Sequence, residues 1–178
     1  MSERALSDAA APGTPVDVVI EDERWEKAGL EALATRAATA TLRHLGLQSA
    51  GEDAPEIVVM GCDDDRIAAL NADFRGKPQP TNVLSWPAAD PAPRAPGAVP
   101  APLDADELGD IAISYDTCAR EAAAQGKPLA DHATHLLVHA ILHLAGYDHE
   151  DDADADTMED AERAILATLD IPDPYREH

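Results

Sequence analysis

Long apolar runs, cysteines and basic residues are all scarce in this sequence, and each shortage narrows the classes of protein it can encode. No stretch approaches the roughly 20 consecutive apolar residues that a membrane-spanning helix needs. The N-terminal segment lacks the charged and then apolar layout of a secretory signal, so we expect a cytoplasmic protein. Cys62 and Cys118 are the only cysteines, and in that compartment we expect two reduced thiols rather than a disulfide.

Basic residues are strongly outnumbered: 13 Lys and Arg stand against 35 Asp and Glu, a formal net charge of −22. Proteins that bind nucleic acid through its phosphates usually carry a basic surface. Composition alone therefore argues against an RNA or DNA partner. A chain of 178 residues, of which 45% are hydrophobic, is nevertheless long and apolar enough to bury the core of one domain.

The pattern of apolar residues indicates one α+β domain over residues 16–175, with a small mixed β-sheet covered by helices. Four runs have the length and composition of strands: Val16–Ile20, Glu56–Cys62, Val83–Trp86 and Leu108–Ser114. Five segments are typical of helices: Asp22–Leu45, Asp63–Phe74, Tyr115–Gly126, Ala130–Leu144 and Asp151–Leu169.

Two segments fall outside this pattern. Residues 1–15 are small, polar and interrupted by prolines, so we expect a disordered leader. Residues 87–107 contain six prolines and many alanines. We expect a flexible or extended insertion there, within the domain rather than between domains, because the segments on both sides are short.

Four of the seven histidines lie in one segment, HLLVHAILHLAGYDHE (His135–Glu150). On an α-helix, His139 and His143 are about 40° apart around the axis and about 6 Å apart along it, so both imidazoles project from one face. Two nitrogens spaced in this way can bind one metal ion. His135 is on the same face but about 12 Å from His143, too far to share the ion, and we assign it a supporting or core role.

The residues after this helix suggest a third ligand. Gly146 follows the expected helix end, where a left-handed residue lets the chain reverse and return His149 toward His139 and His143. Three neutral imidazoles leave a tetrahedral ion one open position, which is typical of a catalytic site. The spacing is that of zincin metallopeptidases, but Ala140 occupies the position of their general base, a Glu. The segment therefore indicates a hydrolase-type metal site and argues against a peptidase.

The histidine segment does not stand alone. In chain order, LNADFRGKPQPTNVLSW (Leu70–Trp86), LGDIAIS (Leu108–Ser114), VHAILHLAGYDH (Val138–His149) and the closing DPY (Asp173–Tyr175) resemble the YbeY family of bacterial rRNA maturation factors and endoribonucleases. The family's histidine segment reads His-Gly-x-x-His-Leu-x-Gly-Tyr-Asp-His. The resemblance extends over most of residues 56–175.

Three positions depart from the family pattern. Ala140 replaces Gly and adds a methyl group near the expected metal, Asn82 replaces Asp and removes a charge, and Trp86 replaces Phe. None of them is an expected ligand.

The resemblance implies that His139, His143 and His149 bind one zinc ion per chain and that Arg75 is the family's essential arginine. That role is physically sensible, because a guanidinium can pair with two phosphate oxygens and stabilise charge that grows on phosphorus during cleavage. Without the resemblance, Arg75 would be interpreted as a solvated residue near a helix end.

Four further residues near these motifs are candidates for supporting roles. Asp148 or Asp110 could orient a ligand histidine through its second nitrogen, although Asp110 could equally satisfy backbone groups at a strand end. If RNA is the substrate, Arg66 and Lys77 would join Arg75 and the metal in a local positive groove on an acidic body.

The function implied by the resemblance is that of a metal-dependent endoribonuclease acting on single-stranded ribosomal RNA. It would act in late small-subunit maturation, at the 3′ end of 16S rRNA, and in ribosome quality control. The implied partners are that RNA, the small ribosomal subunit with its proteins, and a ribosome-assembly GTPase, with no membrane involved. Two alternatives stay open: a non-catalytic ribosome-assembly factor with a structural metal, and a zincin-like hydrolase of another substrate.

Overall fold

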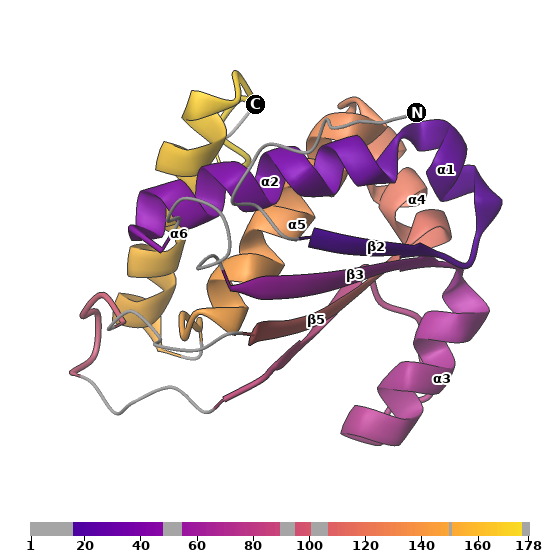
Figure 1. The fold of residues 1–178 in the computed structure, drawn as a ribbon, viewed down its shortest axis with the longest axis horizontal. Helices are drawn as coiled ribbons and strands as arrows, with labels where there is room; N and C mark the ends of the chain where they lie inside the picture. Colours follow the sequence, from indigo (N-terminus) through magenta and orange to yellow (C-terminus); the bar gives the residue numbers. More distant parts are fainter. Residues whose placement is uncertain (1–15, 48–54, 90–94, 101–106, 150, 176–178) are drawn as a thin grey trace.

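The computed structural model describes residues 16–47, 55–89, 95–100, 107–149 and 151–175, and its four strands form one mixed sheet (Figure 1). The strand order is β2-β3-β5-β4. β2 (Val16–Ile20), β3 (Glu56–Cys62) and β5 (Glu107–Ser114) are parallel, and β4 (Val83–Pro87) runs antiparallel to β5 at one edge. The predicted α+β class is confirmed. The expected leader, residues 1–15, lies outside the described residues.

The helices follow the predicted segments with one difference. They are α1 (Glu23–Ala28), α2 (Leu30–Leu45), α3 (Asp64–Arg75), α4 (Tyr115–Gln125), α5 (Leu129–Leu144) and α6 (Asp152–Thr168). The single helix expected over Asp22–Leu45 is divided at Gly29, whose left-handed φ of 79° ends α1 and redirects the chain into α2. Within the described ranges, no helix is long and apolar enough to cross a bilayer.

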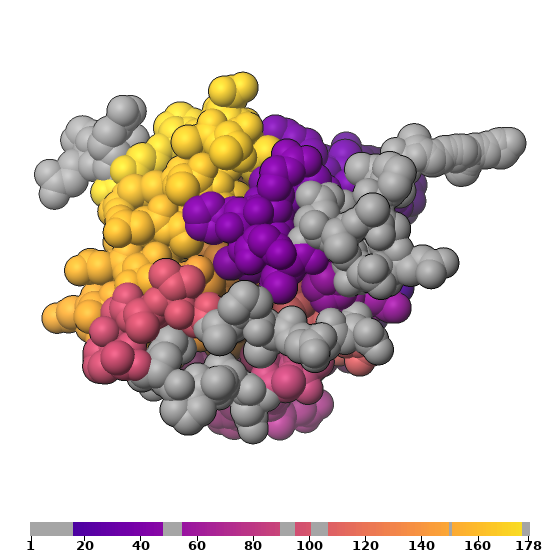
Figure 2. Space-filling view, turned by 60° about the vertical axis from the view of Figure 1, so that its left-hand side comes forward, coloured from indigo at the N-terminus to yellow at the C-terminus, as the bar shows by residue number. Residues whose placement is uncertain are grey.

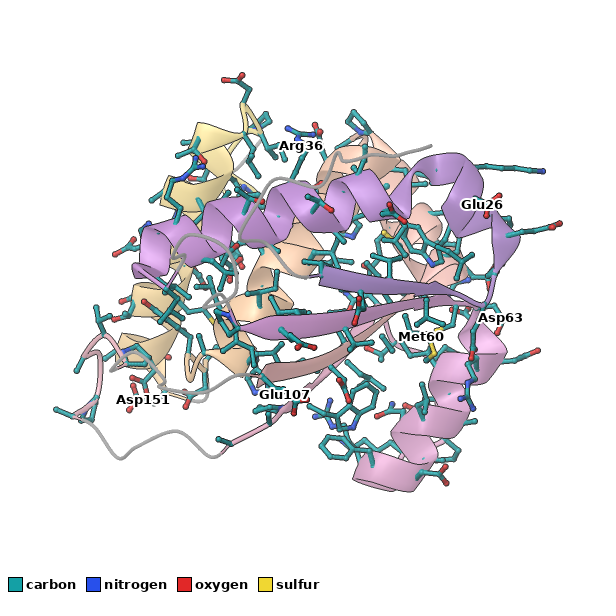
Figure 3. The ribbon with its side chains drawn as sticks, viewed as in Figure 1. Glu26, Arg36, Met60, Asp63, Glu107 and Asp151 are labelled. Atoms are coloured by element: carbon teal, nitrogen blue, oxygen red, sulfur yellow. The ribbon has the colours of Figure 1, made fainter. Side chains whose placement is uncertain are left out.

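The sheet separates two apolar clusters. Along β3, Ile57 and Val59 face the larger core, which α2 and α5 cover, whereas Met60 and Cys62 face the side on which α3 packs. Figure 3 shows the Met60 side chain beside the start of α3. Both Cys62 and Cys118 are buried and free, as predicted. Because α5 contacts α2, α4, α6, β4 and β5, it is the central helix of the domain.

Gly109 explains the LGDI motif at the start of β5. The register shifts there, from Glu56 opposite Glu107 to Ile57 opposite Gly109, and Gly109 has a φ of 142°. A Cβ atom at this position would collide with the carbonyl oxygen of Trp86 on β4. Only glycine therefore allows β4 to pair closely with β5 at this point.

The Pro-rich insertion connects β4 to β5, and part of it is anchored. The backbone N–H of Gly97 donates to Asp154 of α6 at 2.8 Å, and the hydroxyl of Thr157 donates to the Gly97 carbonyl at 2.6 Å. Figure 2 shows residues 95–100 lying against the start of α6. At Gly97 the insertion is thus held to the domain, where the sequence predicted a flexible or extended segment. Residues 90–94 and 101–106 lie outside the described residues.

Candidate active site

A cavity of about 700 Å³ lies between α5, the edge strand β4 and the end of α3. Its lining includes six of the nine residues singled out in the sequence: Arg75, His135, His139, His143, Asp148 and His149. They come from the end of α3, from α5 and from the segment after α5. The fold therefore brings residues from three of the four motifs that carry the resemblance to one cavity.

The other three predicted residues do not line this cavity. Arg66 is at the first turn of α3, and its guanidinium pairs with Glu21 at 3.1 Å. Asp110 is exposed on β5, in register with Trp86. Lys77 is exposed just beyond the end of α3.

His139 and His143 are each held by a hydrogen bond at Nδ1. His139 Nδ1 donates to Glu162 Oε2 at 2.8 Å, and His143 Nδ1 is bonded to Ser85 Oγ at 2.6 Å. In both rings Nε2 is then the nitrogen that is left for a ligand. This is the arrangement of metal-binding histidines, which use one nitrogen for the ion and the other for a protein partner. The donor chemistry therefore fits a metal site.

The third expected ligand lies close to the first. The ring centroids of His139 and His149 are 5.4 Å apart, and both rings line the cavity. In the part of the chain that the structure describes, however, no three His, Cys, Asp or Glu side chains are arranged to hold a metal ion. The cavity thus gathers the three imidazoles without forming a closed ligand cluster, and the ligand set stays a prediction.

The chain reversal that places His149 follows the prediction. α5 ends at Leu144, and Gly146 has a φ of 106°. The N–H of Tyr147 then donates to the Leu142 carbonyl at 3.0 Å, and the Tyr147 side chain is buried. This turn is fixed on both sides, so the residues that follow are returned to the cavity rather than into solvent.

Glu162 on α6 joins several cavity residues. It is completely buried and accepts hydrogen bonds from His135 at 2.7 Å, His139 at 2.8 Å and the Tyr175 hydroxyl at 2.6 Å. Burial by itself would raise the pKa of Glu162, but the hydrogen bonds from these three residues outweigh it and lower the pKa to about 2. The carboxylate is therefore ionised at neutral pH and orients His139.

His143 is kept in the form that a metal requires. Burial lowers the pKa of His143, and the neighbouring His139, His149 and Arg75 lower it further, because a second positive charge beside them is unfavourable, while Asp148 acts in the opposite direction. The imidazole is therefore neutral near pH 7, and a neutral imidazole is the ligand form of histidine.

Sequence reasoning missed four residues of the site: Phe74, Ser85, Glu162 and Tyr175. A signal for Glu162 was present. Met158, Ala161, Ile165 and Leu166 form the buried stripe of α6, and Glu162 lies within that stripe. A carboxylate at a core position of an amphipathic helix needs buried partners, and the histidines of α5 could supply them. No comparable signal marks Ser85, because a polar residue on an edge strand is usual.

The fold and the cavity define a small α+β protein whose candidate active site combines several imidazoles with one arginine. The family model described as "Endoribonuclease YbeY" matches residues 17–170, and the chain belongs to this family.

Individual relatives agree with the family match. The chain is 71% identical to Endoribonuclease YbeY of Paracoccus denitrificans over 92% of this chain and 91% of that protein. It is 57% identical to Endoribonuclease YbeY of Cereibacter sphaeroides over 90% of this chain and 98% of that protein. The solution structure of TM1509 from Thermotoga maritima is similar in fold, with a TM-score of 0.54 at 20% identity, over 91% of this chain and 99% of that one.

Proposed function

We propose that this protein is a zinc-dependent endoribonuclease that cleaves single-stranded RNA. His139, His143 and His149 would hold the ion, and Arg75 would act on the phosphate. The observation that carries the proposal is the cavity itself, where these four residues meet and where His139 and His143 each commit Nδ1 to a protein partner. The relatives are named endoribonucleases, and this supports RNA as the substrate class.

Zinc suits the three imidazoles, because it accepts nitrogen ligands in a tetrahedral site and leaves one position open. When bound, it would polarise a phosphodiester oxygen and lower the pKa of a coordinated water. Glu162 and Ser85 would fix the orientation of His139 and His143. Such supporting partners strengthen a metal site because the ligands need not be ordered when the ion binds.

Arg75 is available for a phosphate. It is exposed at the end of α3 and lines the cavity. The arginine ion pairs among the described residues involve Arg24, Arg66, Arg120 and Arg163, and none involves Arg75. A guanidinium without a carboxylate partner can pair bidentately with phosphate oxygens and stabilise negative charge in the transition state.

The net negative charge of the chain opposes RNA binding, but this charge is sparse in the cavity. Asp148 is the single carboxylate among the described residues that line the cavity. The labelled acidic residues Glu26, Asp63, Glu107 and Asp151 lie around the outside of the fold (Figure 3). The negative charge would therefore slow long-range approach more than it opposes contact at the site. Docking onto a protein of the small ribosomal subunit would reduce the dependence on that approach.

We place this activity in the maturation of the 3′ end of 16S rRNA and in ribosome quality control, with the small subunit and a ribosome-assembly GTPase as partners. A peptidase is not favoured, because Ala140 lines the cavity at the position where a zincin would carry its general base.

The test is cleavage of a single-stranded 16S rRNA 3′ fragment by four samples: protein as purified, chelated protein, chelated protein reloaded with zinc, and Arg75→Glu. We expect loss of cleavage on chelation, recovery with zinc and loss in the variant. Cleavage that survives both chelation and the variant would contradict the proposal. Inactivity of all four samples with one bound zinc per chain would instead favour the non-catalytic assembly factor.

A further inference from the structure

Phe74 is the single phenylalanine of the chain, and it is exposed. Its relative exposure is 55%, although burying a side chain of this size would stabilise the fold. Of the four large hydrophobic residues exposed in the described ranges, two are aromatic, Phe74 and Tyr175, and both line the cavity. Two aromatic side chains are thus exposed to solvent at the candidate active site.

The Phe74 ring is positioned without being covered. Its centroid is 5.4 Å from that of Trp86, at an interplanar angle of 69°. In such an edge-to-face contact at most one face of each ring is occupied. Trp86 itself packs against the cluster that includes Cys62 and Leu84, so it is a firm support. At least one face of Phe74 is therefore free of Trp86.

Tyr175 has a different environment. Its hydroxyl donates to Glu162 at 2.6 Å, its ring meets His135 edge-on at 5.6 Å, and the Arg163 guanidinium lies 5.4 Å from its ring centroid. These contacts make Tyr175 a fixed wall of the cavity. Phe74 is the aromatic residue whose surface is most open to a ligand.

We propose that Phe74 is a stacking platform for an unpaired nucleobase, next to the Arg75 that binds the adjoining phosphate. This inference rests on the proposed function and names how that site recognises its substrate. Phe74 and Arg75 are consecutive residues and line the same cavity, so they can contact one nucleotide together. Stacking requires a base that is not already paired and stacked in a duplex, so the platform selects single strands.

Stacking also suits an acidic protein. It draws on the faces of the bases, which are uncharged, and it is tolerant of sequence because every base has such a face. A site with one arginine and one stacking ring would bind RNA with a weak dependence on salt, unlike proteins that rely on many phosphate contacts.

The experiment measures binding by fluorescence anisotropy to two labelled oligonucleotides of equal length. One is single-stranded with all bases present, and the other is abasic throughout, with the same phosphates. We compare the wild-type protein with Phe74→Ala and Phe74→Trp. Val19→Ala is the matched control, because Val19 is an exposed hydrophobic residue that does not line the cavity. Thermal melts establish that each variant is folded.

We expect Phe74→Ala to weaken binding of the base-containing strand by about 5- to 150-fold, the range for one stacked base, and to leave binding of the abasic strand unchanged. Val19→Ala should bind both strands as the wild type does, and Phe74→Trp, which keeps an aromatic face, should restore the preference for the base-containing strand that Phe74→Ala loses. Equal weakening of both strands, or no weakening, would overturn the platform while the wild-type protein still binds and cleaves RNA. Failure of the wild-type protein to bind either strand would overturn the proposed function and the platform together.

Discussion

The two sides of the cavity are built in opposite ways. On the side of α5 and α6, a fully buried carboxylate, Glu162, accepts hydrogen bonds from His135 and His139. On the side of α3, Phe74 and Arg75 are exposed, and no ion pair within the described residues restrains Arg75. A buried, hydrogen-bonded network fixes atoms to within a fraction of an ångström, as a metal ion requires. An exposed rim can adapt to a flexible polymer. We therefore expect substitutions on the two sides to separate metal binding from RNA binding.

The largest effect is expected on the side of α5 and α6, from His143→Ala. Removing one of the three ligands should greatly weaken zinc binding and lower cleavage about a thousand-fold, because Lewis-acid stabilisation is worth several kcal/mol. His44→Ala on α2 is the matched control, since His44 is an exposed histidine that does not line this cavity. Zinc content measured by mass spectrometry and single-turnover cleavage check the prediction. A variant that keeps both zinc and activity would show that His143 is not a metal ligand.

On the side of α3, Arg75→Gln should lower cleavage by about 100- to 1,000-fold. This is the loss expected when one hydrogen-bond donor that stabilises transition-state charge is removed. Zinc content and melting temperature should not change, because Arg75 is exposed. Arg66→Gln lies on the same helix and is the control, since Arg66 pairs with Glu21. Equal losses in the two variants would mean that α3 contributes only diffuse positive charge.

Much of this contrast could be predicted from the sequence, but unevenly. The histidine spacing and Gly146 identified three residues that do line one cavity, because helix periodicity and glycine conformation are local properties. The partners of those histidines could not be predicted in the same way. Glu162 lies 23 residues from His139 along the chain and on another helix, and only the packing of α6 against α5 brings them together. Ser85 meets His143 across a longer gap of 58 residues.

The fold shows the same limit. The four strands lie within one residue of their expected bounds, since β-branched runs identify buried strands. The division at Gly29 was not predicted, because a glycine in a helical pattern can be tolerated or can end the helix, and the packing of Trp25 and Leu30 decides. The exposure of Phe74 was likewise invisible, because an aromatic residue beside a helix end is usually buried.

A smaller effect is expected from Glu162→Gln, which keeps the shape of the side chain but removes its charge. Zinc affinity should fall about 10- to 100-fold, the usual loss for a residue that orients a ligand histidine. The free energy of unfolding should also fall by about 1 to 3 kcal/mol, because buried hydrogen bonds to a charged group are weakened. Glu159→Gln, one turn away on α6, is the control. Competition titration with a chromophoric chelator measures the affinity, and an unchanged value would contradict the orienting role.

The smallest effect is expected from Ser85→Ala. Its hydroxyl makes one neutral hydrogen bond to His143, so we expect a loss of about 0.5 to 1.5 kcal/mol in the free energy of unfolding. Zinc affinity should fall less than in Glu162→Gln. Denaturant titration of the metal-free protein measures the first quantity. A loss of zinc affinity as large as in His143→Ala would show that the edge strand, and not α6, controls the site.

The central claim is that the α5 and α6 side of the cavity holds a metal ion through three imidazoles. X-ray absorption at the zinc edge of the reloaded protein tests it most directly, with His149→Ala as the comparison. We predict three nitrogen neighbours and one oxygen at about 2.0 to 2.1 Å in the wild-type protein, and two nitrogen neighbours in the variant. Sulfur neighbours, or a spectrum that the variant leaves unchanged, would contradict the account.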